Sequence, residues 1–317
     1  AALVPVYLHT VYEGNPFYNG TKTVLTIHNL HFQGIANIDT VKYHSNIPEY
    51  AFSPDRLEFN ADANIMKGGI VYSNFVTTVS NTYANEIRTP EYGEALEGVL
   101  NDYAYKLGGI VNGVDYDVYN PGTDWYIYDR YGVDNFADAK RWNKEKLQAE
   151  LGMYQDVNKF MIGIISRLTD QKGLDLINAV MDRIVDDHTQ VVVIGTGDKK
   201  YEDAFRGYEW NHKGSVCSNI IYSNERAHKL YAAADAILVP SRFEPCGLTQ
   251  LIAMRYGTVP IVRETGGLRD TVQPYNGFDH TGTGFTFYEY NAEVMLNVIN
   301  YAKQIFFEDR FGWECIA

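Results

Sequence analysis

Apolar runs rich in β-formers alternate along this chain with stretches of helical period. The runs are Val24–Ile27, Phe75–Val79, Gly109–Val111, Phe160–Ile165, Gln190–Ile194, Asn219–Tyr222, Ala236–Val239 and Val259–Val262. After the fourth run, apolar residues recur at steps of three and four, at Leu174, Ile177, Met181 and Ile184. This periodicity predicts a helix that crosses between two parallel strands. The chain is therefore predicted to be α/β, with parallel sheets covered by helices.

The length of the chain predicts more than one domain. A single hydrophobic core rarely extends beyond about 250–300 residues, and this chain has 317. Turn-forming residues are dense at Asn112–Asp115 and again at Tyr119–Gly122, which is typical of a boundary. We therefore predict one doubly wound domain over residues 1–112 and a second over residues 113–317. The second would begin with a polar, partly helical connector that reaches about Asp156.

The net charge of the chain bears on its partners, and its cysteines bear on its compartment and metal content. The formal net charge is −13 and no basic cluster offsets it, so neither nucleic acid nor an anionic membrane is an expected partner. No apolar run is long enough to cross a bilayer. The three cysteines, Cys217, Cys246 and Cys315, lack metal-ligand spacing. They predict reduced thiols in a cytosol-like compartment and no structural metal.

The most informative motif is Pro-Ser-Arg-Phe-Glu-Pro-Cys-Gly-Leu-Thr-Gln, at residues 240–250. It follows the apolar run Ala236–Val239 and precedes an amphipathic run at 248–254. This order predicts a loop from a strand to a helix at the carboxyl edge of a sheet. Glu244 in such a loop is suited to hold a sugar hydroxyl, while backbone N–H groups beyond Gly247 meet a phosphate. The motif indicates a nucleotide-sugar site.

A second motif, Ser-Arg-Leu-Thr-Asp-Gln-Lys-Gly at residues 166–173, directly follows a predicted strand. Arg167 and Lys172 are five residues apart across a loop that enters a helix. A guanidinium fork and an ammonium point charge there are suited to a diphosphate. Two solvated cations on a turn are the plainer interpretation, and the motif taken alone does not decide between them.

Three further segments follow predicted strands. Glu-Thr-Gly-Gly-Leu-Arg-Asp at 264–270 has Gly266 and Gly267, where the backbone can approach a ligand closely. Gly-Thr-Gly-Asp at 195–198 is explained equally well by a plain turn. His28 ends the first apolar run, where a structural role and a role in the site are about equally supported by the sequence. These segments extend the predicted site along the same kind of sheet edge.

Taken in order, seven strings resemble the family of bacterial glycogen synthases and plant starch synthases over nearly the whole chain. They are Thr-Ile-His-Asn-Leu at 26–30, Lys-Gly-Gly-Ile at 67–70, Asn-Gly-Val-Asp at 112–115, Ser-Arg-Leu-Thr at 166–169, Gln-Lys-Gly at 171–173, Glu-Pro-Cys-Gly-Leu-Thr-Gln at 244–250 and Thr-Gly-Gly-Leu at 265–268. The resemblance implies a GT-B fold, in which two Rossmann-like domains face a cleft. It also implies a retaining hexosyltransferase that carries glucose from ADP-glucose to the nonreducing 4-hydroxyl of an α-1,4-glucan, without a metal or other cofactor. The implied location is the bacterial cytoplasm or the plastid stroma.

The same resemblance assigns roles to residues. Arg167 and Lys172 would hold the diphosphate and stabilise the departing ADP, because charge at the leaving group is what such a transferase must stabilise. Glu244 would bind donor glucose hydroxyls, and His28 would contact the glucosyl unit from the other domain. The implied nucleotide-sugar-binding residues are Tyr222 near adenine, with Asn112, Cys246, Gly247, Leu248, Thr249, Gly266 and Gly267 around the phosphates, ribose and sugar.

Sequence leaves the route of retention open. Glu244 would be a nucleophile in a double displacement, or an orienting residue in a front-face reaction in which the leaving phosphate deprotonates the acceptor. The resemblance favours the second. We expect the two domains to close on the substrate to exclude water, with residues 112–119 as the hinge.

One departure from the family pattern is important. Family members carry an N-terminal Lys-x-Gly-Gly-Leu loop that reaches the donor, and no such loop precedes Ala1. Lys67 lies in a similar string, but at the place of a different family segment, so the donor role is not assigned to it. About half of the first domain and a closing C-terminal helix are expected to be missing from this chain.

Other classes of function make different demands on the sequence. A transferase that uses UDP-glucose is the nearest alternative, and a donor-competition assay separates it. An inactive glucan-binding fragment would not need Arg167, Lys172 and Glu244, all of which are present. A phosphorylase of this fold would need a lysine segment for pyridoxal phosphate, and none matches. No oligomeric state is predicted.

Overall fold

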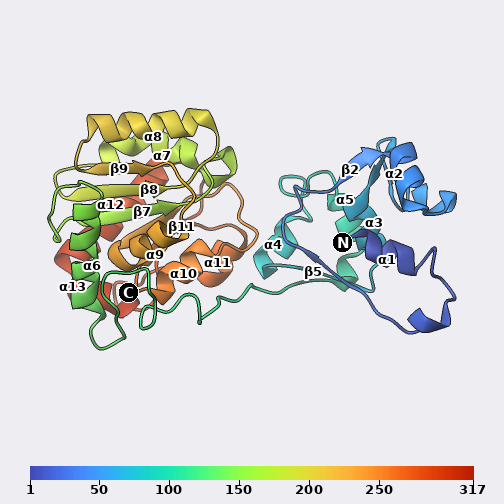
Figure 1. Ribbon diagram of the computed structural model, residues 1–317, viewed down its shortest axis with the longest axis horizontal. Coiled ribbons are helices and arrows are strands. Elements are labelled where there is room, and N and C mark those ends of the chain that lie inside the picture. The colour runs from blue at the N-terminus through green and yellow to red at the C-terminus, as the bar shows by residue number, and fades with distance from the viewer. The chain divides into compact units, whose positions relative to one another are not determined.

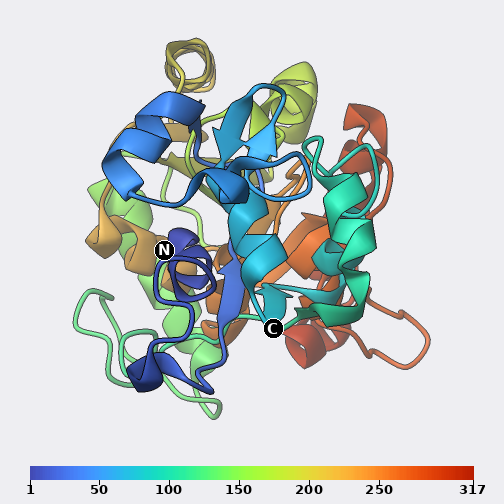
Figure 2. The ribbon, with the colours of Figure 1, turned by 90° about the vertical axis from the view of Figure 1, so that its right-hand side faces the viewer.

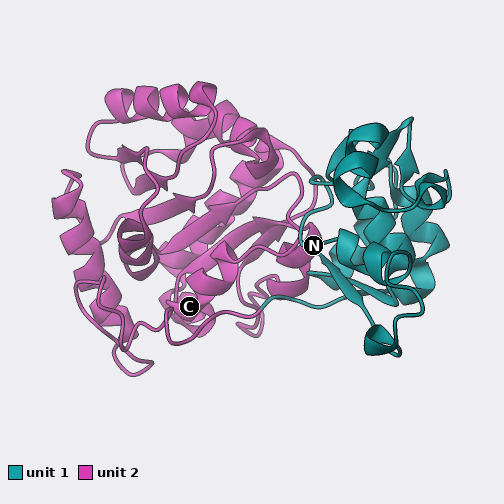
Figure 3. Ribbon diagram, turned by 45° about the vertical axis from the view of Figure 1, so that its right-hand side comes forward, with its two compact units in different colours: residues 1–112 teal, residues 113–317 magenta.

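The computed structural model describes residues 1–317, which form two compact units, Ala1–Asn112 and Gly113–Ala317 (Figure 3). Each unit has its own parallel sheet and its own hydrophobic clusters. No helix in the structure has the length and apolar character needed to span a bilayer.

The second unit is built on a six-stranded parallel sheet (Figure 1). Its strands are β7 (Phe160–Ile165), β8 (Thr189–Ile194), β9 (Val216–Asn219), β10 (Ala236–Val239), β11 (Val259–Arg263) and β12 (Phe285–Phe287). Their order in space is β12-β11-β10-β7-β8-β9. The chain therefore runs outward from β7 to β9, returns to pair β10 with β7, and runs outward again to β12. The reversal between β7 and β10 is a topological switch point, where ligands of open α/β sheets bind.

Helices cover both faces of this sheet (Figure 1). One face packs against α7 (Leu174–Ile184), α8 (Lys199–Asn211), α12 (Ala292–Glu308) and α13 (Arg310–Ile316). The other packs against α6 (Phe136–Glu150), α9 (Asn224–Ala233), α10 (Thr249–Arg255) and α11 (Gly266–Thr271). The predicted crossover helix is confirmed as α7, which ends at Ile184.

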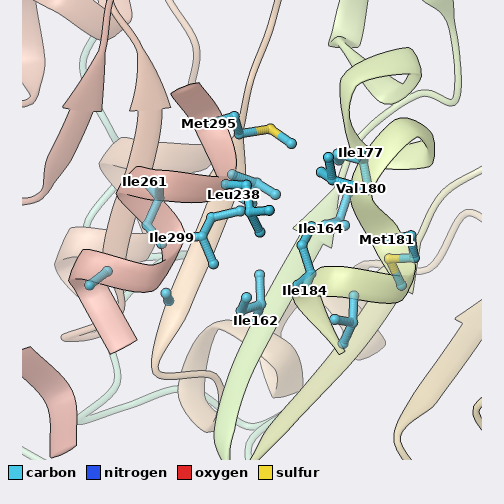
Figure 4. Close-up of a cluster of buried hydrophobic side chains, with 14 of the residues drawn as sticks. Ile162, Ile164, Ile177, Val180, Met181, Ile184, Leu238, Ile261, Met295 and Ile299 are labelled. Carbon is cyan, nitrogen blue, oxygen red and sulfur yellow. The ribbon is translucent and has the colours of Figure 1, made fainter. Parts of the chain in front are cut away.

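Side chains of the central strands alternate between the two helical layers, as a strand period of two requires. Ile162 and Ile164 of β7 join the cluster beneath α7 and α12, whereas Met161 joins the opposite cluster beside α6 and α9. Figure 4 shows the first cluster, with Ile177, Val180, Met181 and Ile184 of α7 and Met295 and Ile299 of α12 around Ile162, Ile164, Leu238 and Ile261. Both faces of the sheet are thus buried.

Lys140 of the connector helix α6 forms hydrogen bonds with the ends of two other helices of the second unit, α9 and α10. Its buried ammonium lies 2.7 Å from Thr258 Oγ1 and 3.1 to 3.3 Å from the carbonyl oxygens of Tyr231, Ala232 and Tyr256. These carbonyls belong to the C-terminal ends of α9 and α10, where a cation is favourable. One turn further along α6, Lys144 pairs with Asp235 at 2.5 Å.

The first unit has a smaller parallel sheet, of β1 (Val24–Ile27), β5 (Phe75–Thr78) and β6 (Leu107–Gly109) in the order β1-β5-β6. Short helices surround it (Figure 2): α1 (Leu3–Leu8), α2 (Ile38–Ser45), α3 (Ile65–Tyr72), α4 (Asn81–Glu86) and α5 (Glu97–Asp102). Leu25 and Ile27 of β1 pack with Ile70 of α3 and Leu100 of α5. The opposite face of β1 stays exposed, as at Val24.

A second sheet in this unit, and β12 of the other unit, were not predicted from the sequence. β2 (Ile35–Asn37), β3 (Glu58–Phe59) and β4 (Asp62–Asn64) form an antiparallel sheet in the order β2-β4-β3. These strands have only two or three residues and polar composition, so they lack the apolar signal on which the prediction depended.

Two predicted strands were misplaced. The strand predicted at 219–222 is wrong in position, since β9 ends at Asn219, where the N–H of Ile221 donates to Asn219 O and the chain turns away. The strand predicted at 109–111 ends at Gly109, and a side chain there would lie 2.3 Å from Ser80 O. In both places the β-branched residues that suggested a strand follow its end.

Candidate functional site

The loops after β7 and β10 meet at the switch point of the second unit. The loop after β7 contains a short 3₁₀ turn, Asp170–Lys172, and then Gly173 with φ of +69°. A side chain at Gly173 would lie 2.0 Å from Pro240 O, so glycine is required for the two loops to touch. The N–H of Arg242 donates to Gln171 O at 2.9 Å and locks the loops together.

This contact brings together Lys172 and Glu244, which are 72 residues apart in sequence. Lys172 Nζ lies 2.6 Å from Glu244 Oε2, and the same oxygen accepts a hydrogen bond of 2.9 Å from Ser241 Oγ. The side chains are 17% and 9% exposed. A pair so enclosed is costly to break by removing one partner, because the other charge is left without compensation.

Arg263, at the end of β11, supports the Glu244 loop and was missed by the sequence analysis. Its buried guanidinium donates to Arg242 O at 2.6 Å and to Tyr288 O at 3.0 Å. The available signal was an arginine directly after a wholly apolar strand, since a buried charge needs such partners.

The two glycines after β11 are required for packing. A side chain at Gly266 would lie 2.0 Å from Glu244 O, and one at Gly267 would lie 2.1 Å from Cys246 O. The N–H of Gly267 also donates to Glu244 O at 3.0 Å. The loops after β10 and β11 therefore touch backbone to backbone, with Cys246 buried between the strand and the helix. Beside them, Gly247 has a φ of +72° and precedes Leu248 and Thr249, where α10 begins.

A pocket of about 230 Å³ adjoins these loops at the carboxyl ends of β7, β8 and β9. Its lining includes Ile165, Arg167, Ile194, Gly195, Tyr222 and His228. Apolar walls with a few polar groups at a switch point are typical of a small-ligand site. Thr196, in the segment that a plain turn also explained, belongs to this lining.

Arg167 and Tyr222 present exposed side chains to this pocket. Arg167 makes no ion pair within the chain, whereas Lys172 is paired with Glu244. Of the two cations in the motif, Arg167 is thus available to a ligand, whereas the charge of Lys172 is compensated by Glu244. Burial raises the pKa of Tyr231, which also lines the pocket, so its hydroxyl stays neutral.

The connector contributes to the same pocket, which the sequence analysis did not foresee. Tyr119 lines it and stacks on the ring of His228, with centroids 4.9 Å apart. His228 is buried, and its Nδ1 lies 2.7 Å from Asp124 Oδ2. No sequence signal links positions more than 100 residues apart, so only the fold reveals this group.

The predicted site residues of the first unit lie apart from these loops in sequence. His28 directly follows β1 and is exposed, and Asn112 is the last residue of the unit and partly buried. Lys67 is buried and donates to the carbonyls of Pro54 and Glu58, each at 2.6 Å. Lys67 therefore holds a loop of its own unit, and no donor role is proposed for it.

Two family models match the chain. One, described as the starch synthase catalytic domain, matches residues 1–102. The other, described as glycosyl transferases group 1, matches residues 144–305 and therefore covers the six-stranded unit.

Known proteins match along nearly the whole chain. A glycogen synthase of Lachnospira eligens is 53% identical over 315 residues, which are 99% of this chain and 66% of that protein. A glycogen synthase of Thermotoga maritima is 48% identical over 99% of this chain and 64% of that protein. The solved catalytic domain of starch synthase IV from Arabidopsis thaliana, bound to ADP and acarbose, is 32% identical with a TM-score of 0.90, covering 100% of this chain and 67% of that one. The chain thus spans about two thirds of the length of its relatives.

Proposed function

The chain belongs to the glycogen synthase and starch synthase family of GT-B glycosyltransferases, and on this premise we propose that it transfers glucose from ADP-glucose to the nonreducing 4-hydroxyl of an α-1,4-glucan. The observation that carries the proposal is the pair of Lys172 and Glu244 at the switch point, beside a pocket with a free arginine. A cation for phosphate and a carboxylate for sugar hydroxyls stand there side by side.

The nucleoside of the donor would occupy the pocket beyond β7, β8 and β9. Its apolar walls suit a flat base, and Tyr222 supplies an exposed ring for stacking. The starch synthase neighbour was solved with ADP, which supports an adenine nucleotide. Arg167 lies in the loop that leads from this pocket to Lys172, so the diphosphate would extend along that loop.

Arg167 and Lys172 would stabilise the charge that develops on the departing diphosphate. Preorganised cations at a developing charge are usually the largest single contribution to catalysis. Lys172 would leave Glu244 for the phosphate, and the sugar hydroxyls would replace Lys172 as donors to Glu244. The exchange keeps both enclosed charges compensated throughout binding.

Glu244 is proposed as an orienting residue and not as a nucleophile. Ser241 donates to its Oε2, and this bond, which would remain when Lys172 moves to the phosphate, lowers the availability of that oxygen for attack. Retention would then follow from reaction on one face, with the leaving phosphate as the base for the acceptor hydroxyl. In this scheme no step requires a metal or another cofactor.

The remaining predicted residues keep supporting roles in the proposal. Gly247, Leu248 and Thr249 would meet the phosphates and ribose, and Gly266 and Gly267 would lie under the donor sugar. Cys246 and Asn112 are kept as neighbours of the donor, and His28 as a contact to the glucosyl unit. A cytosol-like compartment fits the three free cysteines.

The test is incorporation of labelled glucose into glycogen, with ADP-glucose or UDP-glucose as donor and no added metal. The 317-residue chain is assayed beside a version extended at its N-terminus. Incorporation from ADP-glucose in either version supports the proposal. Preference for UDP-glucose would make it a different transferase of the same fold, and failure with both donors in both versions would leave an inactive glucan-binding protein.

A further inference from the structure

We propose that Asp124 and Tyr256 are positioning residues that hold the imidazole of His228 with Nε2 facing the nucleoside pocket, and that His228 thereby selects a purine with a 6-amino group over one with a 6-carbonyl group. The inference rests on the proposed function, since it takes the pocket to hold the nucleoside of the donor. The connector would take part in this selection, because it supplies Asp124.

The three side chains form one buried hydrogen-bonded group. Asp124 Oδ2 lies 2.7 Å from His228 Nδ1 and accepts a bond of 2.6 Å from the Tyr256 hydroxyl. Its Oδ1 accepts a bond of 2.8 Å from the N–H of Tyr126. Asp124 and His228 are 6% and 4% exposed, and Tyr256 is fully buried. A buried carboxylate with three donors is fixed in place.

The network decides which ring nitrogen of His228 carries the proton. Burial raises the pKa of Asp124, but the hydrogen bonds from His228, Tyr256 and Tyr126 outweigh it and hold that pKa below its ordinary value. Asp124 is therefore an anion at neutral pH and only accepts hydrogen bonds. In the neutral ring of His228, Nδ1 must then carry the proton, and Nε2 is left as an acceptor.

Aromatic neighbours prevent the ring from turning. Tyr119 stacks on its face at 4.9 Å with an angle of 20°, and the ring of Tyr126 meets it edge-on at 5.1 Å. Nε2 has no hydrogen-bond partner within the chain, yet it is not among the fully enclosed polar atoms. His228 lines the pocket, and Nε2 is its one ring nitrogen without a partner in the chain, so we take Nε2 as the atom that meets a bound ligand.

An acceptor at this position discriminates among bases by their edges. The amino group of adenine donates a hydrogen bond, whereas hypoxanthine and guanine carry a carbonyl oxygen at the same position. Two acceptors facing each other lose a hydrogen bond and leave a buried group without a partner. We therefore expect ADP to bind more tightly than inosine diphosphate, which differs from ADP only by that amino-to-carbonyl change and the accompanying ring proton.

The test measures equilibrium binding of ADP and inosine diphosphate to the 317-residue chain by titration calorimetry. The parent is expected to favour ADP on the order of tenfold. His228→Leu should bring the two affinities to within about twofold of each other, and Asp124→Asn should reduce the preference several-fold. A merely structural role would weaken both ligands equally and leave their ratio unchanged.

Asp182→Asn is the matched control, because Asp182 pairs with His212 at the same 2.7 Å but on the surface and outside the pocket. It should keep the parental ratio. An unchanged ratio in a folded His228→Leu protein overturns the inference and leaves the proposed function standing. A parental ratio near one also overturns it, whatever the variants do. Absence of ADP binding by both the 317-residue chain and its N-terminally extended version overturns both proposals.

Discussion

The two units differ in how completely their parallel sheets are buried. In the second unit every residue of β8, β10 and β11 is buried, because helices cover both faces of the sheet. In the first unit β1 alternates between buried and exposed residues, and Val24 is 63% exposed. Accordingly, the second unit encloses two ion pairs, Lys144 with Asp235 and Lys172 with Glu244, whereas the ion pairs of the first unit are exposed. Helices on both faces of a sheet are what enclose an ion pair.

The largest expected effect is on turnover and ADP binding, and it should distinguish residues of the second unit from His28 of the first. Arg167→Ala and Lys172→Ala should each lower turnover by about two to three orders of magnitude relative to the parent, since each removes a cation from the leaving group. They should also weaken ADP binding, measured by calorimetry. His28→Ala, in the first unit, should leave ADP affinity unchanged. Turnover within a few-fold of the parent would remove the two cations from the mechanism.

The second comparison is one of core packing. Leu238→Ala should lower the free energy of unfolding by about 2–5 kcal/mol, because Leu238 is buried between α7 and α12 and the structure closes the resulting cavity only in part. Val24→Ala should change it by less than about 0.5 kcal/mol. Urea unfolding with hydrogen exchange resolved by unit gives both values. A large loss from Val24→Ala would mean that this face of β1 is covered in solution.

Two glycines of similar backbone conformation provide a finer test. Gly173 has a φ of +69° and no room for a side chain, whereas Gly14 of the first unit has a φ of +76° and no atom within 4 Å of such a side chain. Gly14→Ala should cost only the strain of a left-handed residue, about 1 kcal/mol. Gly173→Ala should cost clearly more and also weaken ADP binding by displacing Lys172. Equal losses in thermal stability would show that the contact with Pro240 O relaxes freely.

The last prediction is a pH dependence that comes from Lys140. Burial lowers its pKa to about 7, while an unfolded lysine titrates near 10.4. Between these values the unfolded chain binds one more proton, so raising the pH stabilises the folded state by up to about 1.4 kcal/mol per pH unit. The free energy of unfolding of the parent minus that of Lys140→Met should therefore increase from pH 7 to pH 9. A difference that stays flat or falls would show that Lys140 stays charged when folded.

Much of the second unit was predictable because its signals are local. The runs at Phe160–Ile165 and Ala236–Val239 are the observed β7 and β10, and the helical period gave the extent of α7. Wholly buried strands leave continuous apolar runs, which are easy to find. The short polar strands β2, β3 and β4 leave none.

The site was predictable only as a set of separate loops. Because parallel strands end at the same edge of a sheet, the sequence predicts that Lys172 and Glu244 lie near each other. Nothing in the sequence indicates that they form an ion pair. The hydrogen bond between Asp124 and His228 depends on the path of an irregular connector across the unit. The position of the Arg263 side chain depends on carbonyls of a neighbouring loop. Long-range polar contacts of this kind follow from the fold and not from local pattern.

If Lys172 binds phosphate and Glu244 binds sugar hydroxyls, as proposed, their ion pair would favour a ligand that supplies both groups together. Inorganic phosphate offers only negative charge, so it would draw Lys172 away and leave a carboxylate that is 9% exposed without its cation. A neutral sugar offers only hydroxyls and leaves an ammonium without its anion. A ligand that carries both parts on one molecule satisfies the two charges at once. Under the proposed roles, phosphate alone or sugar alone should therefore bind more weakly than a ligand that carries both, because either one breaks the ion pair that the chain already holds.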